Sequence, residues 1–365
     1  MSSALYPRST DQSSANVSVV FGRGDGTFQT RERLAVGNGP TWVIAADLNA
    51  DGTQDLVAVN NVSNDISVLF GNGDATFQPE RRIPVGIRPT AAAAADLDGD
   101  CTPDLIVTNS NNNDVSVLLN SGSAPEQRLG VGTNPAGIAI ADLNGDGNFD
   151  LITANTSSND ISVLLGNGNG TFQTQLRYAA ISNPNSIALG DFNGDGKHDV
   201  VIAAAGEIAD NVAVLLGNGD GSFQRPQIFG VGSGTRGVAL ADMNGDLKLD
   251  IVVANTFSDD ISVLLGNGDG TFQPEQRFSL GDVNPRAVKV IDVDGDGRLD
   301  ILTANDMGSV SLLLGNGDGT FLAPQVFVTG GLTRSLAVAD LNGDGKPDIA
   351  TADNLRNQLS VLLHR

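Results

Sequence analysis

The residues of this chain that could do chemistry are concentrated in a nine-residue acidic pattern that occurs seven times. Each copy places oxygen-bearing side chains at positions 1, 3, 5 and 9, and successive copies begin 46 to 51 residues apart. The copies begin at Asp47, Asp96, Asp142, Asp191, Asp242, Asp292 and Asp340. A period of this length is typical of solenoids, propellers and arrays. The spacing therefore predicts one repeated structural unit with one cation site per copy.

The predicted ligands are the side chains at positions 1, 3, 5 and 9 and the backbone carbonyl at position 7. All are hard oxygen ligands, which favours Ca²⁺ over zinc or copper. We expect five to seven bound Ca²⁺ ions. Copy by copy, the predicted ligands are Asp47, Asn49, Asp51, Thr53 and Asp55; Asp96, Asp98, Asp100, Thr102 and Asp104; Asp142, Asn144, Asp146, Asn148 and Asp150; Asp191, Asn193, Asp195, Lys197 and Asp199; Asp242, Asn244, Asp246, Lys248 and Asp250; Asp292, Asp294, Asp296, Arg298 and Asp300; and Asp340, Asn342, Asp344, Lys346 and Asp348.

Two other interpretations of the acidic pattern are solvated acidic turns and an EF-hand, whose loop opens with the same residues. Chance would not repeat the spacing seven times, which argues against simple turns. An EF-hand needs a bidentate Glu at position 12. That position carries mostly apolar or small residues, as in Val107, Thr153, Ile202, Val253 and Thr303. The sequence therefore favours a calcium loop between two strands.

Position 6 of the pattern is Gly in five copies, which fits a sharp turn that brings the oxygens together. Cys101 and Leu247 stand there in the second and fifth copies. A left-handed backbone costs such residues on the order of 1 kcal/mol. We expect sites 2 and 5 to be the weakest, with Asp98 compensating at site 2.

Composition supports internal metal ligation. The formal net charge is −22, and only five of the 43 acidic residues are Glu. Seven divalent ions would reduce this charge to about −8, and the acidity argues against a nucleic-acid partner. The single Cys101 excludes an intrachain disulfide, and no apolar stretch is long enough to span a membrane. Residues 1–15 are expected to be a flexible leader without the features of a signal peptide.

Each repeat reads as four short strands, A to D, with the acidic pattern between A and B. In strand A, large residues such as Ile138 and Ile140 alternate with small ones such as Ala139 and Ala141. This alternation fits the innermost strand of twisted sheets packed face to face. The predicted fold is all-β: residues 16–365 form one seven-bladed β-propeller of four-stranded antiparallel blades. An N-terminal strand at 28–36 is expected to complete the last blade; whether 17–21 or 359–363 supplies its third strand stays open.

The segments VVFGRGDG and VLFGNGDA, each followed by an acidic loop, resemble the FG-GAP or VCBS repeat of integrin α-subunit N-terminal propellers and many bacterial surface proteins. The resemblance covers about residues 16–365. It implies a seven-bladed propeller with Ca²⁺ in the A–B loops of one face. By the same resemblance, ligands would use the B–C and D–A loops of the opposite face.

Further motifs have ordinary structural explanations. The GNGDGTF segments read as hairpins between strands C and D, with a second cation site as the alternative. Arg23-Gly24-Asp25 spells an integrin-binding tripeptide but falls in register with this hairpin. His198 and His364 lack a repeated nucleophile or carboxylate partner, and no phosphate-binding loop is found, so we expect no enzymatic activity.

Four residues are candidate ligand contacts. Arg236, Arg286 and Arg334 occupy the same position in three consecutive repeats, six residues before the acidic pattern. A propeller would bring them into an arc suited to carboxylates or sulfates. Trp42 is expected at the mouth of the axial channel as a plug or a stacking contact. Solvated charges are the alternative for the arginines, and Lys289 replaces a small strand-A residue as a channel-facing or carboxylate-paired lysine.

The sequence therefore predicts a non-enzymatic, calcium-stabilised binding or adhesion propeller, acting outside the cytoplasm or at the cell surface. Its partner is expected to be a protein or glycan ligand, with acidic groups in keeping with the arginines. The alternatives are a carbohydrate-binding or carbohydrate-processing module of a larger secreted enzyme, and a structural spacer. We expect a monomer that does not bind nucleic acid.

Overall fold

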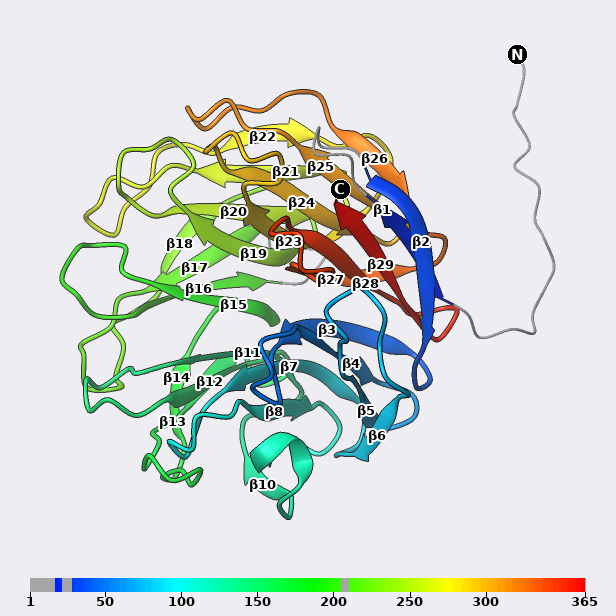
Figure 1. Cartoon of the computed structure of the whole chain (residues 1–365). Helices are drawn as coiled ribbons and strands as arrows, with labels where there is room; N and C mark the ends of the chain where they lie inside the picture. The colour runs from blue at the N-terminus through cyan, green and yellow to red at the C-terminus, as the bar shows by residue number, and fades with distance from the viewer. Residues whose placement is uncertain (1–16, 22–27, 205–209, 365) are drawn as a thin grey trace.

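The computed structural model describes residues 17–21, 28–204 and 210–364, which form seven small β-sheets arranged around one axis (Figure 1). Blade 1 contains β3 (Pro40–Ala46), β4 (Asp55–Asn60), β5 (Asp65–Leu69) and β6 (Arg81–Pro84); blade 2 contains β7 (Pro89–Ala95), β8 (Asp104–Asn109), β9 (Asp114–Leu118) and β10 (Gln127–Gly130); blade 3 contains β11 (Pro135–Ala141), β12 (Asp150–Asn155), β13 (Asp160–Leu164) and β14 (Leu176–Ala179). Blade 4 contains β15 (Pro184–Gly190), β16 (Asp199–Ala204), β17 (Asn211–Leu215) and β18 (Gln227–Gly230); blade 5 contains β19 (Thr235–Ala241), β20 (Asp250–Asn255), β21 (Asp260–Leu264) and β22 (Gln276–Ser279); blade 6 contains β23 (Pro285–Ile291), β24 (Asp300–Asn305), β25 (Ser309–Leu313) and β26 (Gln325–Val328). The predicted seven-bladed, all-β propeller is confirmed.

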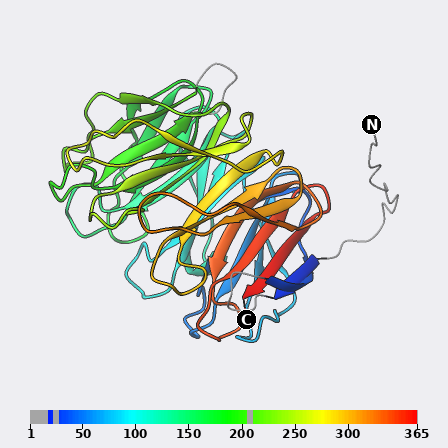
Figure 2. The same ribbon diagram turned by 90° about the horizontal axis from the view of Figure 1, so that it is seen from above.

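Blade 7 contains both ends of the described chain. Its strands β27 (Thr333–Ala339), β28 (Asp348–Asp353) and β29 (Gln358–His364) are followed across the sheet by β2 (Phe28–Ala35). The strand β1 (Val17–Phe21) pairs with β2 and, in parallel, with β29. The third place, left open by the sequence, is therefore taken by β29. In Figure 2 the first strands lie beside the last strands of the chain.

Burial explains the order of strands within a blade. Every residue of the seven B strands is buried, because each B strand has a neighbouring strand on both sides and a neighbouring blade on both faces. The D strands of blades 3 to 6 form the outer edge and have mostly exposed or half-buried residues. The near-continuous apolar B segments and the more polar D segments thus follow from their distance to the axis.

Seven apolar clusters fill the junctions between successive blades. The ring closes, because Leu56 and Val43 of blade 1 share one cluster with Val361 and Ala337 of blade 7. Around the axis each A strand contacts the next, and β27 contacts β3. Burial of apolar area at about 25 cal/mol per Å² is the main stabilising contribution at such junctions.

The start of each A strand is irregular in the same place. The second residue of every A strand is skipped in the pairing with strand B, as between Pro285 and Ala287 in blade 6. A bulge of this kind leaves one residue unpaired and redirects its side chain. The skipped positions include Arg236, Arg286 and Arg334, the three predicted ligand contacts.

The GNGDGTF segments form hairpins between strands C and D that also link neighbouring blades. Within one such hairpin, Asp269 Oδ1 accepts bonds from the backbone N–H and the hydroxyl of Thr271, at 2.9 and 2.6 Å. The N–H of Gly270 reaches the carbonyl of Phe192 in the acidic loop of the preceding blade, at 3.0 Å. In blade 2 the segment is replaced by the short 3₁₀ turn η1 (Leu119–Gly122), where the Ser121 hydroxyl donates to a loop carbonyl instead.

Some expectations fall on residues outside the described ranges. These are the leader at 1–15 and the Arg23-Gly24-Asp25 tripeptide. Within the described ranges, no helix has the length and apolar character needed to cross a bilayer.

Candidate metal loops and axial cavity

Position 1 of the acidic pattern organises each A–B loop through backbone hydrogen bonds. In the third copy, Asp142 Oδ1 accepts the N–H of Gly145 at 2.7 Å, and Oδ2 accepts the N–H of Gly147 at 2.8 Å. The equivalent contact from the residue at position 6 recurs in all seven copies, at 2.7 to 2.9 Å. The loop is therefore wrapped around its first carboxylate.

Position 9 is a buried carboxylate at the start of each B strand. In the third copy, Asp150 Oδ2 accepts the N–H of Leu143 at 2.8 Å and Oδ1 accepts the N–H of Gly166 at 2.7 Å. Burial is the largest cause of a raised pKa at this position, and nearby loop carboxylates raise it further. The same direction holds in the first six copies, and the pKa of Asp300 reaches about 6. These carboxylates lie where a cation would offset their repulsion.

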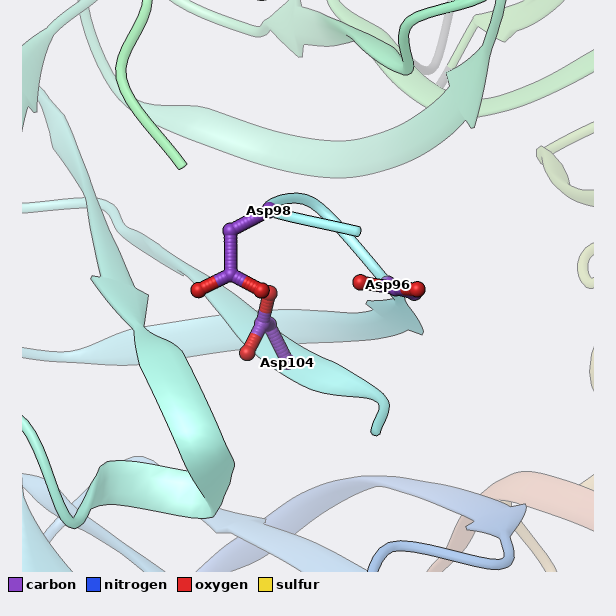
Figure 3. Close-up of side chains that lie close together, drawn as sticks. All are labelled: Asp96, Asp98 and Asp104. Atoms are coloured by element: carbon purple, nitrogen blue, oxygen red, sulfur yellow. The ribbon is translucent and has the colours of Figure 1, made fainter. Parts of the chain in front are cut away.

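Three carboxylates converge in the two copies that carry Asp at position 3. Oxygens of Asp96, Asp98 and Asp104 all lie within 4.8 Å of one another, and so do those of Asp292, Asp294 and Asp300. Figure 3 shows Asp98 and Asp104 directed toward each other, with Asp96 beside them on the loop after β7. Such a set of hard oxygen ligands, one of them buried, fits a Ca²⁺ ion. In these two loops positions 1, 3 and 9 are thus brought together.

Positions 5 and 7 of each acidic loop are joined by a hydrogen bond. In every copy Oδ1 of the position-5 Asp accepts the N–H of the residue at position 7. Side chains at position 7 add to this contact: the hydroxyl of Thr53 bonds Asp51 at 2.5 Å and lowers the pKa of that carboxyl. Asp100 and Asp296 consequently lie outside the two three-carboxylate clusters found in the described loops.

The five copies with Asn at position 3 contain one carboxylate fewer. In the first and third copies the Asn side chain donates to Asp at position 5, with Asn49 Nδ2 at 2.8 Å from Asp51 Oδ2 and Asn144 Nδ2 at 2.9 Å from Asp146 Oδ2. The amide oxygen of the same Asn accepts the backbone N–H at position 5. Each loop is therefore held by its own polar groups.

The loop backbone is left-handed at positions 4 and 6. Cys101 has φ 68° and Leu247 has φ 64°, as their replacement of Gly predicted. A Cβ at the Gly position would meet no atom within 4 Å in the other loops, and Leu247 is 94% exposed. The cost of these residues is therefore conformational and not steric. Sequence reasoning missed position 4, where Ala50 has φ 58° and the other copies carry Gly.

The second candidate site is a cavity of about 630 Å³ on the propeller axis, lined by residues of the A strands. Its lining contains the skipped second residue of all seven A strands: Thr41, Thr90, Ala136, Asn185, Arg236, Arg286 and Arg334. These residues lie at the start of the A strands, whereas the acidic loops follow their ends. The cavity extends along the A strands as far as Ala45, Ile291 and Val338, and its mouth is the end formed by these second residues, opposite the acidic loops.

The three predicted arginines lie together at this mouth. Arg286 Nη1 pairs with Asp306 Oδ2 at 2.8 Å. Within the described chain, no carboxylate lies within ion-pair distance of Arg236 or Arg334, and Nε of Arg334 is buried without a hydrogen-bond partner. Burial, and then repulsion by Arg286, lowers the pKa of both unpaired arginines. Asp306 opposes this lowering at both Arg236 and Arg334, although it forms an ion pair only with Arg286.

Trp42 and Lys289 also line the cavity. Trp42 is half-buried, packs against the cluster between blades 1 and 2, and donates its indole N–H to the carbonyl of Ala92 at 3.1 Å. Lys289 faces the cavity, and the surrounding ring of strands lowers its pKa by desolvation. None of the described carboxylates forms an ion pair with it. Lys289 is thus a channel-facing lysine.

Sequence reasoning missed Asp306 and Arg88. Asp306 follows the last residue of β24, where equivalent residues in other blades are Asn61, Ser110, Thr156, Thr256 and Asn354. Arg88 lines the cavity with a left-handed backbone, φ 54°, where the equivalent residues of other blades include Asn134, Asn183 and Asn284. Each of the two residues could have been found in the sequence, because it differs from the residues at the same position of the other repeats.

Comparison with known proteins supports the repeat assignment. A family model for an FG-GAP-like repeat matches residues 9–58, 47–107, 96–153, 142–202, 191–253, 242–303 and 292–351. Comparison with curated protein sequences gives no match.

Several solved structures are similar in fold. BBS1N, crystallised in complex with ARL6DN, is 15% identical with a TM-score of 0.66, and the match covers 96% of this chain and 98% of that one. An Agrocybe aegerita lectin that recognises non-reducing terminal N-acetylglucosamine is 21% identical with a TM-score of 0.56, covering 86% and 89%. A protein of unknown function from Desulfotomaculum acetoxidans is 15% identical with a TM-score of 0.63, covering 84% and 90%.

Proposed function

This chain belongs to the FG-GAP-like repeat family, and we propose that it is a calcium-stabilised binding propeller that acts without catalysis. One observation carries the proposal: the two ends of the axis have opposite charge and different chemistry. One end repeats the same oxygen ligands in seven loops, and the other opens into a cavity with an arc of arginines. The acidic loops stabilise the ring, and the cavity end binds the ligand.

The calcium part of the proposal rests on the ligand set of the loops. Asp96, Asp98 and Asp104 would hold one ion, and Asp292, Asp294 and Asp300 another. When bound, Ca²⁺ would neutralise carboxylates that otherwise repel one another. In the five Asn-containing loops, Asp at positions 1, 5 and 9 and Asn at position 3 are the proposed ligands. Sites of this kind stay filled at the millimolar Ca²⁺ found outside cells, so we place the protein there.

The binding part of the proposal rests on the cavity end. Guanidinium groups pair bidentately with carboxylates and sulfates, and Arg236 and Arg334 have no such partner among the described residues. A protein or glycan with acidic groups is therefore the proposed ligand. BBS1N was crystallised with a protein partner, which is one precedent for a propeller of this shape as a binding module.

A carbohydrate-binding module is the second candidate. The similar Agrocybe aegerita lectin recognises a sugar, although 21% identity extends to fold alone. In this chain the half-buried Trp42 at a polar cavity is the observation that favours sugars. The described lining of the cavity contains no Asp, Glu, His or Cys, and none of its Ser or Thr residues has one of these groups beside it in the lining as a base.

The proposal is tested by binding the intact chain to arrays of glycans and extracellular-matrix proteins, with Ca²⁺ and with chelator. We expect binding to acidic members in Ca²⁺ and its loss with chelator. The triple variant R236Q/R286Q/R334Q should lose that binding at low and moderate salt. No binding to any member, or equal binding by the triple variant, would contradict the proposed ligand face.

A further inference from the structure

The axial cavity is strongly cationic within a chain of net charge −22. Its described lining includes Arg88, Arg236, Arg286, Lys289 and Arg334 and no acidic residue. Asp306 neutralises Arg286, so four of these five positive charges lack a carboxylate at ion-pair distance within the described chain. Like charges gathered in one cavity repel one another. A polyanionic ligand would remove that repulsion, whereas a neutral ligand would not.

The cations lie at two levels of the cavity. Arg236, Arg286 and Arg334 are second residues of their A strands, at the mouth. Lys289 is three residues further along β23 than Arg286, which is about 10 Å at the usual rise per residue. One small anion would meet only one level. An elongated ligand with at least two separated acidic groups meets both.

Arg88 adds a cation on the other side of the mouth, at a conformational cost. The left-handed backbone that suits Asn134 and Asn183 in the equivalent loops is strained for a residue such as Arg. Its backbone is held there by a bond from the Arg88 N–H to Asn64 Oδ1 at 2.8 Å. Strain of this kind occurs preferentially at binding sites. Arg88 therefore belongs with the arc as part of one cationic rim.

The remaining walls suit a hydroxylated ligand. Thr41 and Asn185 line the mouth. Trp42 contributes part of an aromatic ring beside them. Sugars present hydroxyls to polar side chains and apolar C–H faces to aromatic rings. A volume of about 630 Å³ is in the range of small-molecule sites.

We propose that the axial cavity binds the end of a uronic-acid chain, with one sugar carboxylate held by Arg236 and Arg334 and a second meeting Lys289. Arg88 closes the rim on the opposite side, and Trp42 contacts a sugar ring. This inference rests on the proposed function, because it names the ligand class of the same binding face. It goes further in naming the sugar acid and in extending the site along the axis to Lys289.

The experiment is calorimetric titration of the intact, Ca²⁺-loaded chain with digalacturonic acid. Lactose is the neutral disaccharide control, and suberate is an aliphatic dicarboxylate without hydroxyls. We expect one site per chain, no binding of lactose, and affinity at least about tenfold weaker for suberate. R236Q/R334Q and K289M should each weaken digalacturonic acid binding at least about tenfold.

The matched control is R225Q, which removes one positive charge from an exposed residue outside the cavity. It should leave the affinity unchanged, and a melting curve in Ca²⁺ should show each variant folded. If K289M does not fold, K289Q gives the same comparison.

Three outcomes would overturn the inference: no heat with digalacturonic acid, equal affinity in R236Q/R334Q and K289M, or suberate binding as tightly as the sugar acid. If glycan or protein arrays still detect a ligand in any of these cases, the proposed function stands while the cavity assignment fails. If digalacturonic acid binds as expected but the arrays detect nothing, the cavity assignment stands and the proposed attachment to proteins or polymeric glycans fails.

Discussion

At one end of the propeller axis the seven loops carry the same acidic pattern, whereas at the other end the second residue of the A strand changes from blade to blade. The acidic end keeps Asp at positions 1, 5 and 9 of all seven loops, and the loop backbone keeps its left-handed conformation even at Cys101 and Leu247. The cavity end carries Thr or Ala in blades 1 to 3, Asn in blade 4 and Arg in blades 5 to 7.

This difference separates structure from recognition. A feature repeated in every blade serves what every blade needs, which is to turn from strand A to strand B and to contact its neighbours. A feature confined to two or three blades breaks the ring's pseudo-symmetry. It can therefore fix the orientation in which a ligand binds.

Removal of Ca²⁺ should have the largest effect. Each filled site stabilises the folded chain by about 2.7 kcal/mol when free Ca²⁺ is 100 times Kd, so several sites together should raise the melting temperature by at least about 10 °C. Scanning calorimetry with Ca²⁺ and with EDTA measures this, and native mass spectrometry should count five to seven ions. Fewer than three ions, or a melting temperature indifferent to EDTA, would contradict a metal-dependent acidic end.

Within one acidic loop, the buried and exposed carboxylates should behave differently. Asp150→Ala leaves the N–H groups of Leu143 and Gly166 without their acceptor, so it should cost at least about 2 kcal/mol in both Ca²⁺ and EDTA. Asp146→Ala removes an exposed carboxylate and should cost stability in Ca²⁺ alone. Denaturant unfolding in both buffers measures the two. An equal, Ca²⁺-dependent loss in both variants would show that position 9 has no structural role of its own.

Between two acidic loops, the turn residue should rank the sites. Asp195→Ala should cost about 1 kcal/mol more than Asp246→Ala in Ca²⁺, because site 4 has Gly196 at the turn and site 5 has Leu247. The control is L247G, which should strengthen site 5 and enlarge the loss caused by Asp246→Ala. Equal losses, or the larger loss at Asp246, would show that position 6 does not determine site strength.

At the cavity end, removing charge should leave stability nearly unchanged. R236Q/R334Q takes away two half-buried cations that repel Arg286, so unfolding free energy should change by no more than about 0.5 kcal/mol, with a small gain the favoured direction. Denaturant unfolding without ligand is the measurement. A loss of several kcal/mol would mean that these arginines hold the ring together, and the contrast between the two ends would fail.

Much of the fold was predictable because its signals are repeated. Seven acidic patterns, the alternation in strand A and the strand count were enough for the number of blades and their order. The position of Arg236, Arg286 and Arg334 around one mouth was also predictable. Residues at the same position of each repeat lie at the same level along the axis of a propeller. In a repeat protein, the position of a residue within its repeat thus predicts its location in the folded structure.

What sequence reasoning missed depends on how individual side chains are oriented in the folded chain. The pairing of Arg286 with Asp306 joins the start of one strand to the loop after the next, and the isolation of Arg334 Nε depends on its whole surroundings. The bond from the Thr53 N–H to Asp51 Oδ1 recurs at the same two positions of all seven loops, but the residue types alone do not show which oxygen accepts it.

The bulge at the start of every A strand has a further consequence for how this scaffold can change. Because the skipped residue takes no part in the strand pairing, its replacement leaves the sheet register intact. The mouth therefore has seven positions whose side chains can vary independently while the backbone of the propeller stays the same. Substitutions at these positions, natural or engineered, can change the specificity of the site one blade at a time without changing the fold of the ring.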